Sequence, residues 1–266
     1  MMHYKRAFST LGCPEYTIDE AIALADRHGL DAVEVRALGG MIDLPAYFAA
    51  TEGSPAALAE RLRPARVRIV SLDTSLHLIG DPEAARAKFL EFLPWAEALG
   101  VRWLRVFDGG KAADASELAQ AAGTVGWWRE IRRANGWKAD LMVETHDSLT
   151  TTAAIRRFLG AAPGTAILWD AFNTWKKSGE NPVETWRAIG PDVVHVHVKD
   201  AISVPSAKHP FTYVLPGTGE FPMAPLAAEL RAGFAGTVSL EWERLWHPYL
   251  APLDNALTSA AERGWW

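Results

Sequence analysis

The stretch Val193-Val194-His195-Val196-His197-Val198-Lys199-Asp200 alternates valine with two histidines and a lysine. Because successive side chains of a β-strand point to opposite faces, His195, His197 and Lys199 share one face of the predicted strand and the valines share the other. The valine face is suited to packing against a layer of helices, which leaves the polar face to point toward the centre of a closed sheet. In this arrangement Lys199 lies nearest to the rim.

Seven other short runs of apolar, β-prone residues occur along the chain, separated by helix-like stretches. Including the first run, the predicted strands are Ala7–Thr10, Ala32–Arg36, Arg68–Asp73, Trp103–Phe107, Leu141–Thr145, Ala166–Asp170, Val193–Lys199 and Thr237–Glu241. Most are apolar enough to be buried on both faces, as the strands of a parallel sheet are. The pattern therefore predicts eight parallel strands.

Recognisable start signals precede several of the predicted helices. Thr17 and Glu20 have the spacing of a capping box directly before the helix expected over Ala21–Arg27. Another helix is predicted over Glu83–Leu99, with a kink at Pro94.

Eight strand-then-helix units in 266 residues give about 33 residues per unit, the spacing of right-handed βαβ crossovers. We therefore predict an α/β protein, a single-domain (β/α)8 TIM barrel over residues 1–266. A doubly wound open sheet is the alternative, but it requires a glycine-rich phosphate-binding turn after its first strand. Ser9-Thr10-Leu11-Gly12-Cys13-Pro14 holds a single glycine, which favours the barrel.

The composition is that of an ordinary globular protein, with 27 lysine and arginine residues against 32 aspartate and glutamate residues and a formal net charge of −5. This balance lacks the basic bias of a general nucleic-acid binder, so no nucleic-acid partner is expected. Cys13 is the single cysteine, which excludes an intramolecular disulfide and fits a reducing compartment. Neither a signal peptide nor a run of roughly 18 apolar residues is evident. We expect a cytoplasmic protein with no membrane partner, and leave homo-oligomeric assembly open.

Strand alternation places ionisable groups at the inward-facing ends of the last four strands. The fifth predicted strand carries Glu144, with His146 just beyond it, the sixth ends in Asp170, and the eighth ends in Glu241. Carboxylates gathered at one end of a barrel would repel one another unless a cation lay between them. A divalent metal is therefore predicted, with Glu144, Asp170, His197 and Glu241 as its ligands.

Three carboxylates and one imidazole form an oxygen-rich donor set. This set favours Mn²⁺ or Mg²⁺, with Co²⁺ or Zn²⁺ as alternatives, over a structural zinc selected by thiolates. Four protein ligands leave positions on an octahedral ion for a substrate carbonyl and hydroxyl group. Taken singly, each residue also has an ordinary structural role, either as a salt-bridge partner or as a core histidine.

Seven segments of the chain together resemble a known family. They are Ser9-Thr10-Leu11-Gly12-Cys13-Pro14, Asp31-Ala32-Val33-Glu34-Val35-Arg36, Val143-Glu144-Thr145-His146, Trp169-Asp170, His195-Val196-His197-Val198-Lys199-Asp200, Gly217-Thr218-Gly219-Glu220-Phe221-Pro222 and Ser239-Leu240-Glu241. The family is the sugar phosphate isomerase/epimerase group of xylose isomerase-like TIM barrels, and the resemblance extends over nearly the whole chain. Its metal ligands are Glu, Asp, His and Glu on strands five to eight, which fall on the four positions named above.

The resemblance implies a metal-dependent isomerase or epimerase with a small-molecule sugar or polyol as substrate. In the family the metal binds a ketone oxygen and an adjacent hydroxyl group, and it stabilises the enediolate formed when a carboxylate removes the α-proton. Glu144 and Glu241 would be the catalytic bases on opposite sides of the substrate carbon. Lys199 would hold an oxyanion or a substrate carboxylate, with a solvated position at the rim as the alternative.

Four further residues are candidates for substrate binding, namely His146, Asn173, Trp246 and His247. The ketose epimerases of the family carry a histidine three residues after the metal-binding aspartate, where this chain has Asn173. Asparagine can hydrogen-bond a hydroxyl group but does not transfer a proton near neutral pH. This departure weakens the expectation of a free-ketose epimerase and keeps isomerases and dehydratases open.

Three other functions compete with the isomerase. A dehydratase of an inosose or dehydroshikimate type would use the same metal. An endonuclease IV-like nuclease would need further ligands and a basic groove, whereas a non-catalytic sugar-binding protein would not need a complete ligand set. Arg36 and Arg105 could bind an anion. Structural ion pairs with Glu34 or Asp73 are the favoured interpretation of these two arginines.

Overall fold

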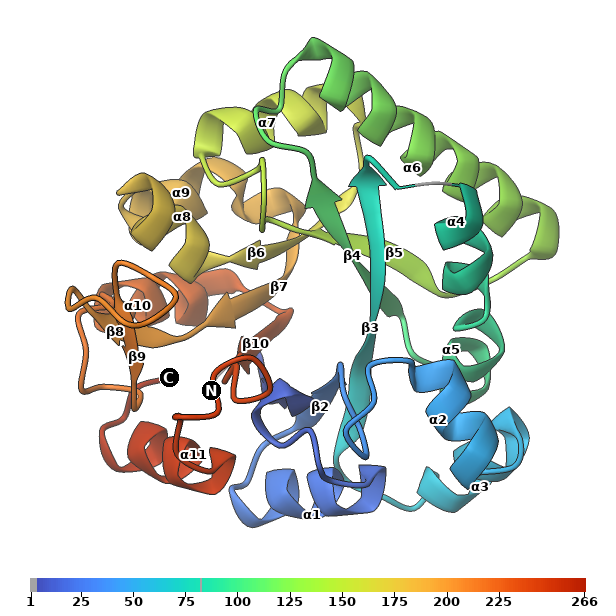
Figure 1. Cartoon of the computed structure of the whole chain (residues 1–266), viewed down its shortest axis with the longest axis horizontal. Helices are drawn as coiled ribbons and strands as arrows, with labels where there is room; N and C mark the ends of the chain where they lie inside the picture. Colours follow the sequence, from blue (N-terminus) through green and yellow to red (C-terminus); the bar gives the residue numbers. More distant parts are fainter. Residues whose placement is uncertain (1–3, 82) are drawn as a thin grey trace.

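The structure, a computed structural model, describes residues 4–81 and 83–266. Eight parallel strands close into one barrel, in the order β1-β10-β7-β6-β5-β4-β3-β2, and helices surround the barrel (Figure 1). The barrel strands are β1 Lys5–Ser9, β2 Ala32–Val35, β3 Arg68–Ile79, β4 Trp103–Gly109, β5 Asp140–Glu144, β6 Ala166–Asp170, β7 Val193–Val198 and β10 Thr237–Leu240. The helices are α1 Ile18–Arg27, α2 Leu44–Thr51, α3 Pro55–Leu62, α4 Glu83–Leu90, α5 Leu93–Leu99, α6 Ala115–Asn135, α7 Thr152–Ala161, α8 Ala171–Ser178, α9 Pro182–Ile189, α10 Met223–Gly233 and α11 Leu253–Glu262. The predicted TIM barrel is confirmed.

Apolar residues at alternate strand positions hold the sheet against the helix layer. Val196 and Val198 of β7 are fully buried, and so are Val33 and Val35 of β2. Because all eight strands are parallel, their carboxyl ends open at one mouth of the barrel, which is where this fold places functional groups.

The helices follow their local start signals, with one correction. Thr17 accepts a hydrogen bond from the N–H of Glu20, and the Glu20 carboxylate accepts one from the N–H of Thr17, so the predicted capping box opens α1. The prediction of one kinked helix over Glu83–Leu99 is wrong, because the chain forms α4 and α5 there, with Pro94 in the first turn of α5. Proline has no N–H to donate, so it fits a first turn better than a helix interior. None of the helices in residues 4–81 and 83–266 is long and apolar enough to cross a membrane.

Strand β3 continues to Ile79, beyond the predicted end at Asp73. After an irregularity in register it pairs again with β4, where His77 lies opposite Phe107. The polar residues after Asp73 suggested the end of the strand, but Leu76 is buried beyond them and continues the apolar pattern. The extension lengthens the β3–β4 side of the barrel mouth.

A short antiparallel hairpin follows β7 and was not predicted. It consists of β8 Asp200–Ile202 and β9 Thr212–Val214, and it lies at the barrel mouth because β8 follows the carboxyl end of β7 (Figure 1). The Asp200 carboxylate anchors its base, since one oxygen accepts hydrogen bonds from the N–H groups of Gly217 and Gly219, both at 2.9 Å.

Candidate functional site

Four ligand-type side chains converge inside the barrel, and we refer to Glu144, Asp170, His197 and Glu241 as the ligand quartet. Glu144 ends β5, Asp170 ends β6, His197 lies in β7, and Glu241 directly follows β10. One ligand atom from each lies within 4.8 Å of the others, and all four side chains are buried. Nδ1 of His197 lies 3.3 Å from Oε1 of Glu144 and 3.4 Å from Oε2 of Glu241. The structure thus brings together the four residues predicted as metal ligands.

Several polar atoms of the quartet have no hydrogen-bond partner within the described residues. Both carboxylate oxygens of Glu144, Oδ2 of Asp170 and Nδ1 of His197 are buried without a hydrogen bond, and their neighbours make ion-pair contacts only. An unsatisfied buried polar group costs about 1–3 kcal/mol, so these atoms are suited to binding something further. A divalent cation fits them, because carboxylate oxygens and an imidazole nitrogen are common ligands of such ions.

Lys199 is buried beside the quartet, so the alternative of a solvated position at the rim is wrong. Its Nζ atom lies 3.0 Å from Oδ2 of Asp170 and also contacts Oε2 of Glu241. A third carboxylate, that of Glu243, lies 2.7 Å from Nζ and accepts a hydrogen bond of 3.0 Å from the hydroxyl group of Tyr213 in β9. The unpredicted hairpin therefore helps to fix the ammonium group, which offsets part of the negative charge of the quartet.

The charge states of two quartet carboxylates follow from their surroundings. Burial acts to raise the pKa of Glu241, but the charges of Lys199 and His197 outweigh burial and bring this pKa to about 2. Burial also opposes ionisation of Glu144, yet Arg105 and His197 hold its pKa well below the usual range. Both glutamates are therefore ionised acceptors at neutral pH.

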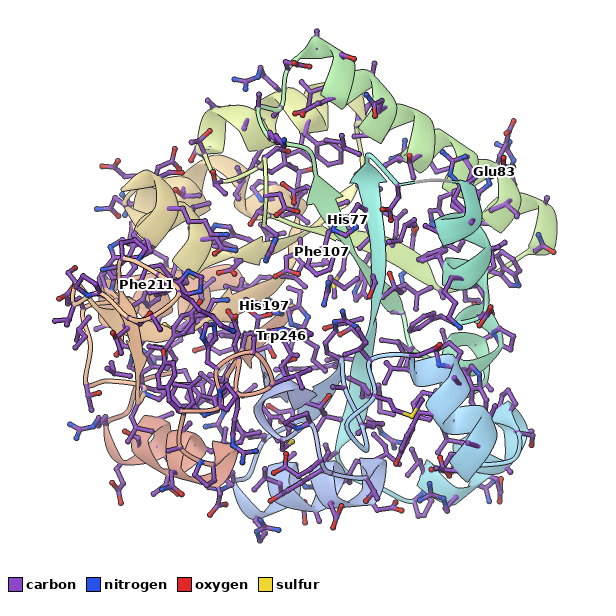
Figure 2. The ribbon with its side chains drawn as sticks, in the orientation of Figure 1. His77, Glu83, Phe107, His197, Phe211 and Trp246 are labelled. Carbon is purple, nitrogen blue, oxygen red and sulfur yellow. The ribbon has the colours of Figure 1, made fainter. Side chains whose placement is uncertain are left out.

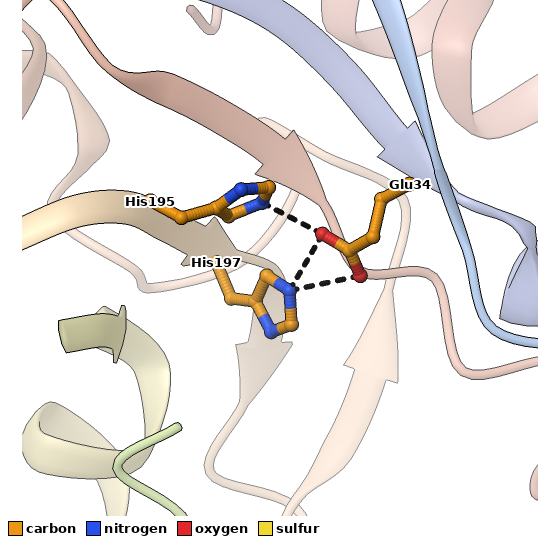
Figure 3. Close-up of side chains that lie close together, drawn as sticks. All are labelled: Glu34, His195 and His197. Carbon is orange, nitrogen blue, oxygen red and sulfur yellow. Dashed lines mark hydrogen bonds and ion pairs between the residues drawn. The ribbon is translucent and has the colours of Figure 1, made fainter. Parts of the chain in front are cut away.

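Glu34 of β2 faces the quartet from another strand of the barrel. Its two carboxylate oxygens lie 3.0 and 2.9 Å from Nε2 of His197, and one of them lies 2.7 Å from Nε2 of His195 (Figure 3). All three side chains are buried. Both inward-facing histidines of β7 thus contact the same carboxylate.

Arg105 of β4 supplies a buried positive charge. Its guanidinium group lies 3.3 Å from Glu144 and 3.8 Å from Asp73, so the expected ion pair with Asp73 exists as a long contact. Arg36 instead donates a hydrogen bond to a serine hydroxyl group of β3, because the carboxylate of Glu34 is turned toward the two histidines.

His146 and Asn173 differ in whether the side chain is free to contact a substrate. The His146 side chain is 41% exposed, with its Nδ1 atom 2.9 Å from Asp147 and its ring 4.9 Å from that of Phe107. Asn173 is buried, and its amide nitrogen donates to the backbone carbonyl of Thr145 at 3.3 Å. His146 can therefore face a substrate directly, whereas the Asn173 amide nitrogen is engaged within the protein.

Trp246, which is labelled in Figure 2, and His247 lie in the loop that follows β10. Trp246 is 42% exposed, while His247 is buried with Nε2 3.7 Å from Glu243. Both residues line a cavity of about 340 Å³ together with Lys208 and Tyr249. Glu243 contacts both His247 of this cavity and the lysine beside the quartet, and so links the two.

Comparison with known proteins is decisive for the family. Residues 22–265 match the family described as xylose isomerase-like TIM barrel. The chain belongs to this family. No curated protein matches the chain significantly.

Several solved structures are similar to this xylose isomerase-like TIM barrel over nearly its whole length. The probable 3-DHS dehydratase AsbF from Bacillus anthracis is 19% identical over 97% of this chain and 99% of that chain, with a TM-score of 0.78. The IolI protein with a binding zinc atom is 19% identical over 98% and 96% of the two chains, with a TM-score of 0.74. A xylose isomerase domain protein from Planctomyces limnophilus is 16% identical over 98% and 95%, with a TM-score of 0.70. At these identities the likeness establishes the fold.

Glu34 and Tyr213 lie near the quartet, but the site predicted from the sequence gave neither of them a role. Glu34 is the single charged residue of the buried strand Ala32–Val35, and a lone buried charge requires a partner. That requirement is a usable signal, although it does not identify the partner. Tyr213 gave no comparable signal, because its contact with Glu243 depends on the unpredicted hairpin.

Proposed function

We propose that this protein is a divalent-metal-dependent isomerase or epimerase that acts on a small-molecule sugar or polyol. The observation that carries the proposal is the ligand quartet, in which buried polar atoms face one another without hydrogen bonds in the described part of the chain. The quartet lies at the carboxyl ends of the barrel strands, where enzymes of this fold hold their active sites. Membership of the xylose isomerase-like family supports the same function.

The cation would be held by Glu144, Asp170, His197 and Glu241. When bound, a divalent ion polarises a substrate carbonyl group and so acidifies the proton on the neighbouring carbon. The oxygen-rich donor set supports Mn²⁺ or Mg²⁺ as the native ion. Zn²⁺, which is present in the IolI structure, and Co²⁺ are the alternatives.

Glu144 and Glu241 are the two bases of the proposed reaction. Their carboxylates approach the same nitrogen of His197, at 3.3 and 3.4 Å, so they border one common space. A substrate carbon in that space would meet a carboxylate on either side, and one would remove a proton while the other returns one. The contacts with Arg105 and Lys199 keep both carboxylates ionised, as a base requires.

Substrate binding is assigned to His146, Asn173, Lys199, Trp246 and His247. Lys199 is placed to hold a substrate oxygen next to the reacting carbon, because its ammonium group already contacts two quartet residues. His146 offers a partly exposed ring at the mouth. Trp246 and His247 line the cavity of about 340 Å³ described above, which would receive the distal part of a substrate.

Turnover in deuterated water tests the proposal. Ketoses, inososes and dehydroshikimate are to be screened against the metal-reconstituted protein, with the mass of the recovered material measured. We expect solvent deuterium in the recovered sugar and no other change in mass, because each base exchanges its proton with water. Glu241→Gln should abolish this exchange. A product lighter by one water, formed in efficient turnover, would overturn the isomerase.

A dehydratase is the second candidate, and His146 is the observation that favours it. Burial acts to lower the pKa of His146, but Asp147 and Glu144 outweigh burial and raise it. The ring is therefore suited to protonate a leaving hydroxyl group after Glu144 has removed the α-proton. The likeness to the probable 3-DHS dehydratase AsbF is in keeping with this candidate. His146→Gln distinguishes the two functions, since at saturating substrate it should stop the loss of water but still allow proton exchange.

A further inference from the structure

Glu34 is a fully buried carboxylate that contacts the ligand quartet without belonging to it. Its oxygens lie 3.0 and 2.9 Å from Nε2 of His197, which are distances of N–H···O hydrogen bonds (Figure 3). An ionised carboxylate can only accept hydrogen bonds. The proton of His197 must therefore reside on Nε2 for these contacts to be favourable.

When a cation displaces the Nδ1 proton of His197, the proton that stays on Nε2 leaves Nδ1 with the lone pair that binds the ion. Nδ1 is the atom that lies close to Glu144 and Glu241, and it has no hydrogen-bond partner among the described residues. The other tautomer would direct a hydrogen into the quartet and set the lone pair of Nε2 against the carboxylate of Glu34. The contact with Glu34 therefore selects the tautomer that can bind a cation.

We propose that Glu34 is the positioning residue of the metal centre, fixing the ring and the tautomer of His197 so that Nδ1 is presented to the ion. The inference rests on the metal site proposed above. His195 completes the arrangement, because its Nε2 lies 2.7 Å from the carboxylate oxygen that also contacts His197. The two rings meet edge to face, at an interplanar angle of 84°, so both reach the carboxylate without stacking on each other.

Glu34, His195 and His197 also lie close enough together to hold a metal themselves. Hydrogen bonding accounts for their geometry better, because Nε2 of His197 already donates to the carboxylate and Nε2 of His195 lies at ion-pair distance from it. A cation at both nitrogens of His197 would require the ring to lose both protons. The proposal therefore predicts one tightly bound ion per chain, and two tightly bound ions per chain would overturn it.

Competition with a chelator measures the Zn²⁺ affinity of the wild type and of two variants. Glu34→Gln keeps the shape of the side chain but removes its charge, and it should weaken Zn²⁺ binding by about 10–100-fold. Glu220→Gln is the matched control, since it makes the same change at an exposed carboxylate that bonds to Ser203 and contacts no quartet residue. This control should keep wild-type affinity. Unchanged affinity in Glu34→Gln, or equal losses in the two variants, would overturn the proposal.

A ¹⁵N spectrum of the Zn²⁺-loaded wild type, labelled at histidine, tests the same inference without a variant. Long-range ¹H–¹⁵N correlations identify the protonated ring nitrogen, which for His197 should be Nε2. A proton on Nδ1 would overturn the positioning role even if Glu34→Gln failed to fold. Zinc binding through Nδ1 without turnover of any substrate would refute the isomerase alone, whereas failure of the wild type to bind zinc would refute both.

Discussion

Two arcs of the barrel interior carry charged side chains of different kinds. The arc of β5, β6, β7 and β10 presents the ligand quartet, in which both carboxylate oxygens of Glu144 and one of Asp170 lack hydrogen bonds within the described residues. The arc of β2, β3 and β4 presents Glu34, Asp73 and Arg105, which form ion pairs with the quartet or with one another. The site therefore contains two classes of charge: the first offers atoms that can bind a ligand, and the second holds the first in place.

The largest effect is expected from a break in the first arc. Asp170→Ala removes a quartet carboxylate and should abolish both stoichiometric metal binding and activity. Removal of the ion from the wild type with a chelator should lower the melting temperature, because an ion at 100 times its Kd stabilises the folded state by about 2.7 kcal/mol. Elemental analysis and calorimetric melting with and without Mn²⁺ measure the two quantities.

The control for this variant is Glu220→Gln, which changes an exposed carboxylate outside both arcs and should retain the ion. The metal assignment is refuted if neither carefully purified protein nor protein reloaded with Mn²⁺ contains a divalent ion.

A break in the second arc should produce a different pattern. Arg105→Met leaves the carboxylate of Glu144 buried without its cationic partner, which should destabilise the metal-free protein by about 3–5 kcal/mol. The loss should be smaller in the metal-saturated protein, because the ion then neutralises Glu144. Urea unfolding with and without saturating Mn²⁺ measures the difference, and Arg105→Lys serves as the charge-preserving control. Equal destabilisation in the two states would contradict the division into arcs.

The two histidines of β7 allow a finer test, because only one of them belongs to the quartet. His197→Ala should lose the metal, whereas His195→Gln should lower the free energy of unfolding by about 1–3 kcal/mol without emptying the site. Metal content and denaturant unfolding separate the two outcomes. Equal loss of metal from both variants would show that the assignment of His197 alone to the quartet is wrong.

The barrel and the residues of the first arc could be predicted because their signals are local. Eight apolar runs of similar spacing predict the strands, and alternation within Val193–Val198 predicts which side chains point inward. Each carboxylate of the quartet lies at or just beyond a strand end, so its place follows from its own strand.

The contacts of Glu34 and the hairpin could not be predicted, because they depend on distant parts of the chain. Glu34 and His197 meet across the barrel from strands that are not neighbours in the sheet. The end of β3 depends on renewed pairing of His77 with β4, which no local pattern reports. Tyr213 bonds to Glu243 only because the β8–β9 hairpin places β9 near that residue.

Glu220, outside both arcs, should give the smallest effect. Its carboxylate accepts hydrogen bonds from the hydroxyl group and, at 2.9 Å, the N–H of Ser203, and it lies 3.3 Å from Nζ of Lys176. These contacts lower the pKa of Glu220 from 4.5 to about 2. Because the pKa is lower in the folded state, the stabilisation is complete above about pH 4.5 and is lost as the pH falls toward about 2.

Glu220→Gln should remove this pH-dependent component of stability and leave metal binding unchanged. Denaturant unfolding of wild type and variant between about pH 6 and about pH 3 should therefore give two stability curves that approach each other as the pH falls. The reason is that protonation of Glu220 in the wild type removes the same charge that the substitution removes. Curves that stay parallel would show that the charge of Glu220 is unimportant. Glu220 bonds to Ser203, which directly follows β8, and Tyr213 of β9 bonds to Glu243, which contacts Lys199. A change in metal affinity would therefore show that the β8–β9 hairpin controls the position of Lys199 and belongs to the first arc.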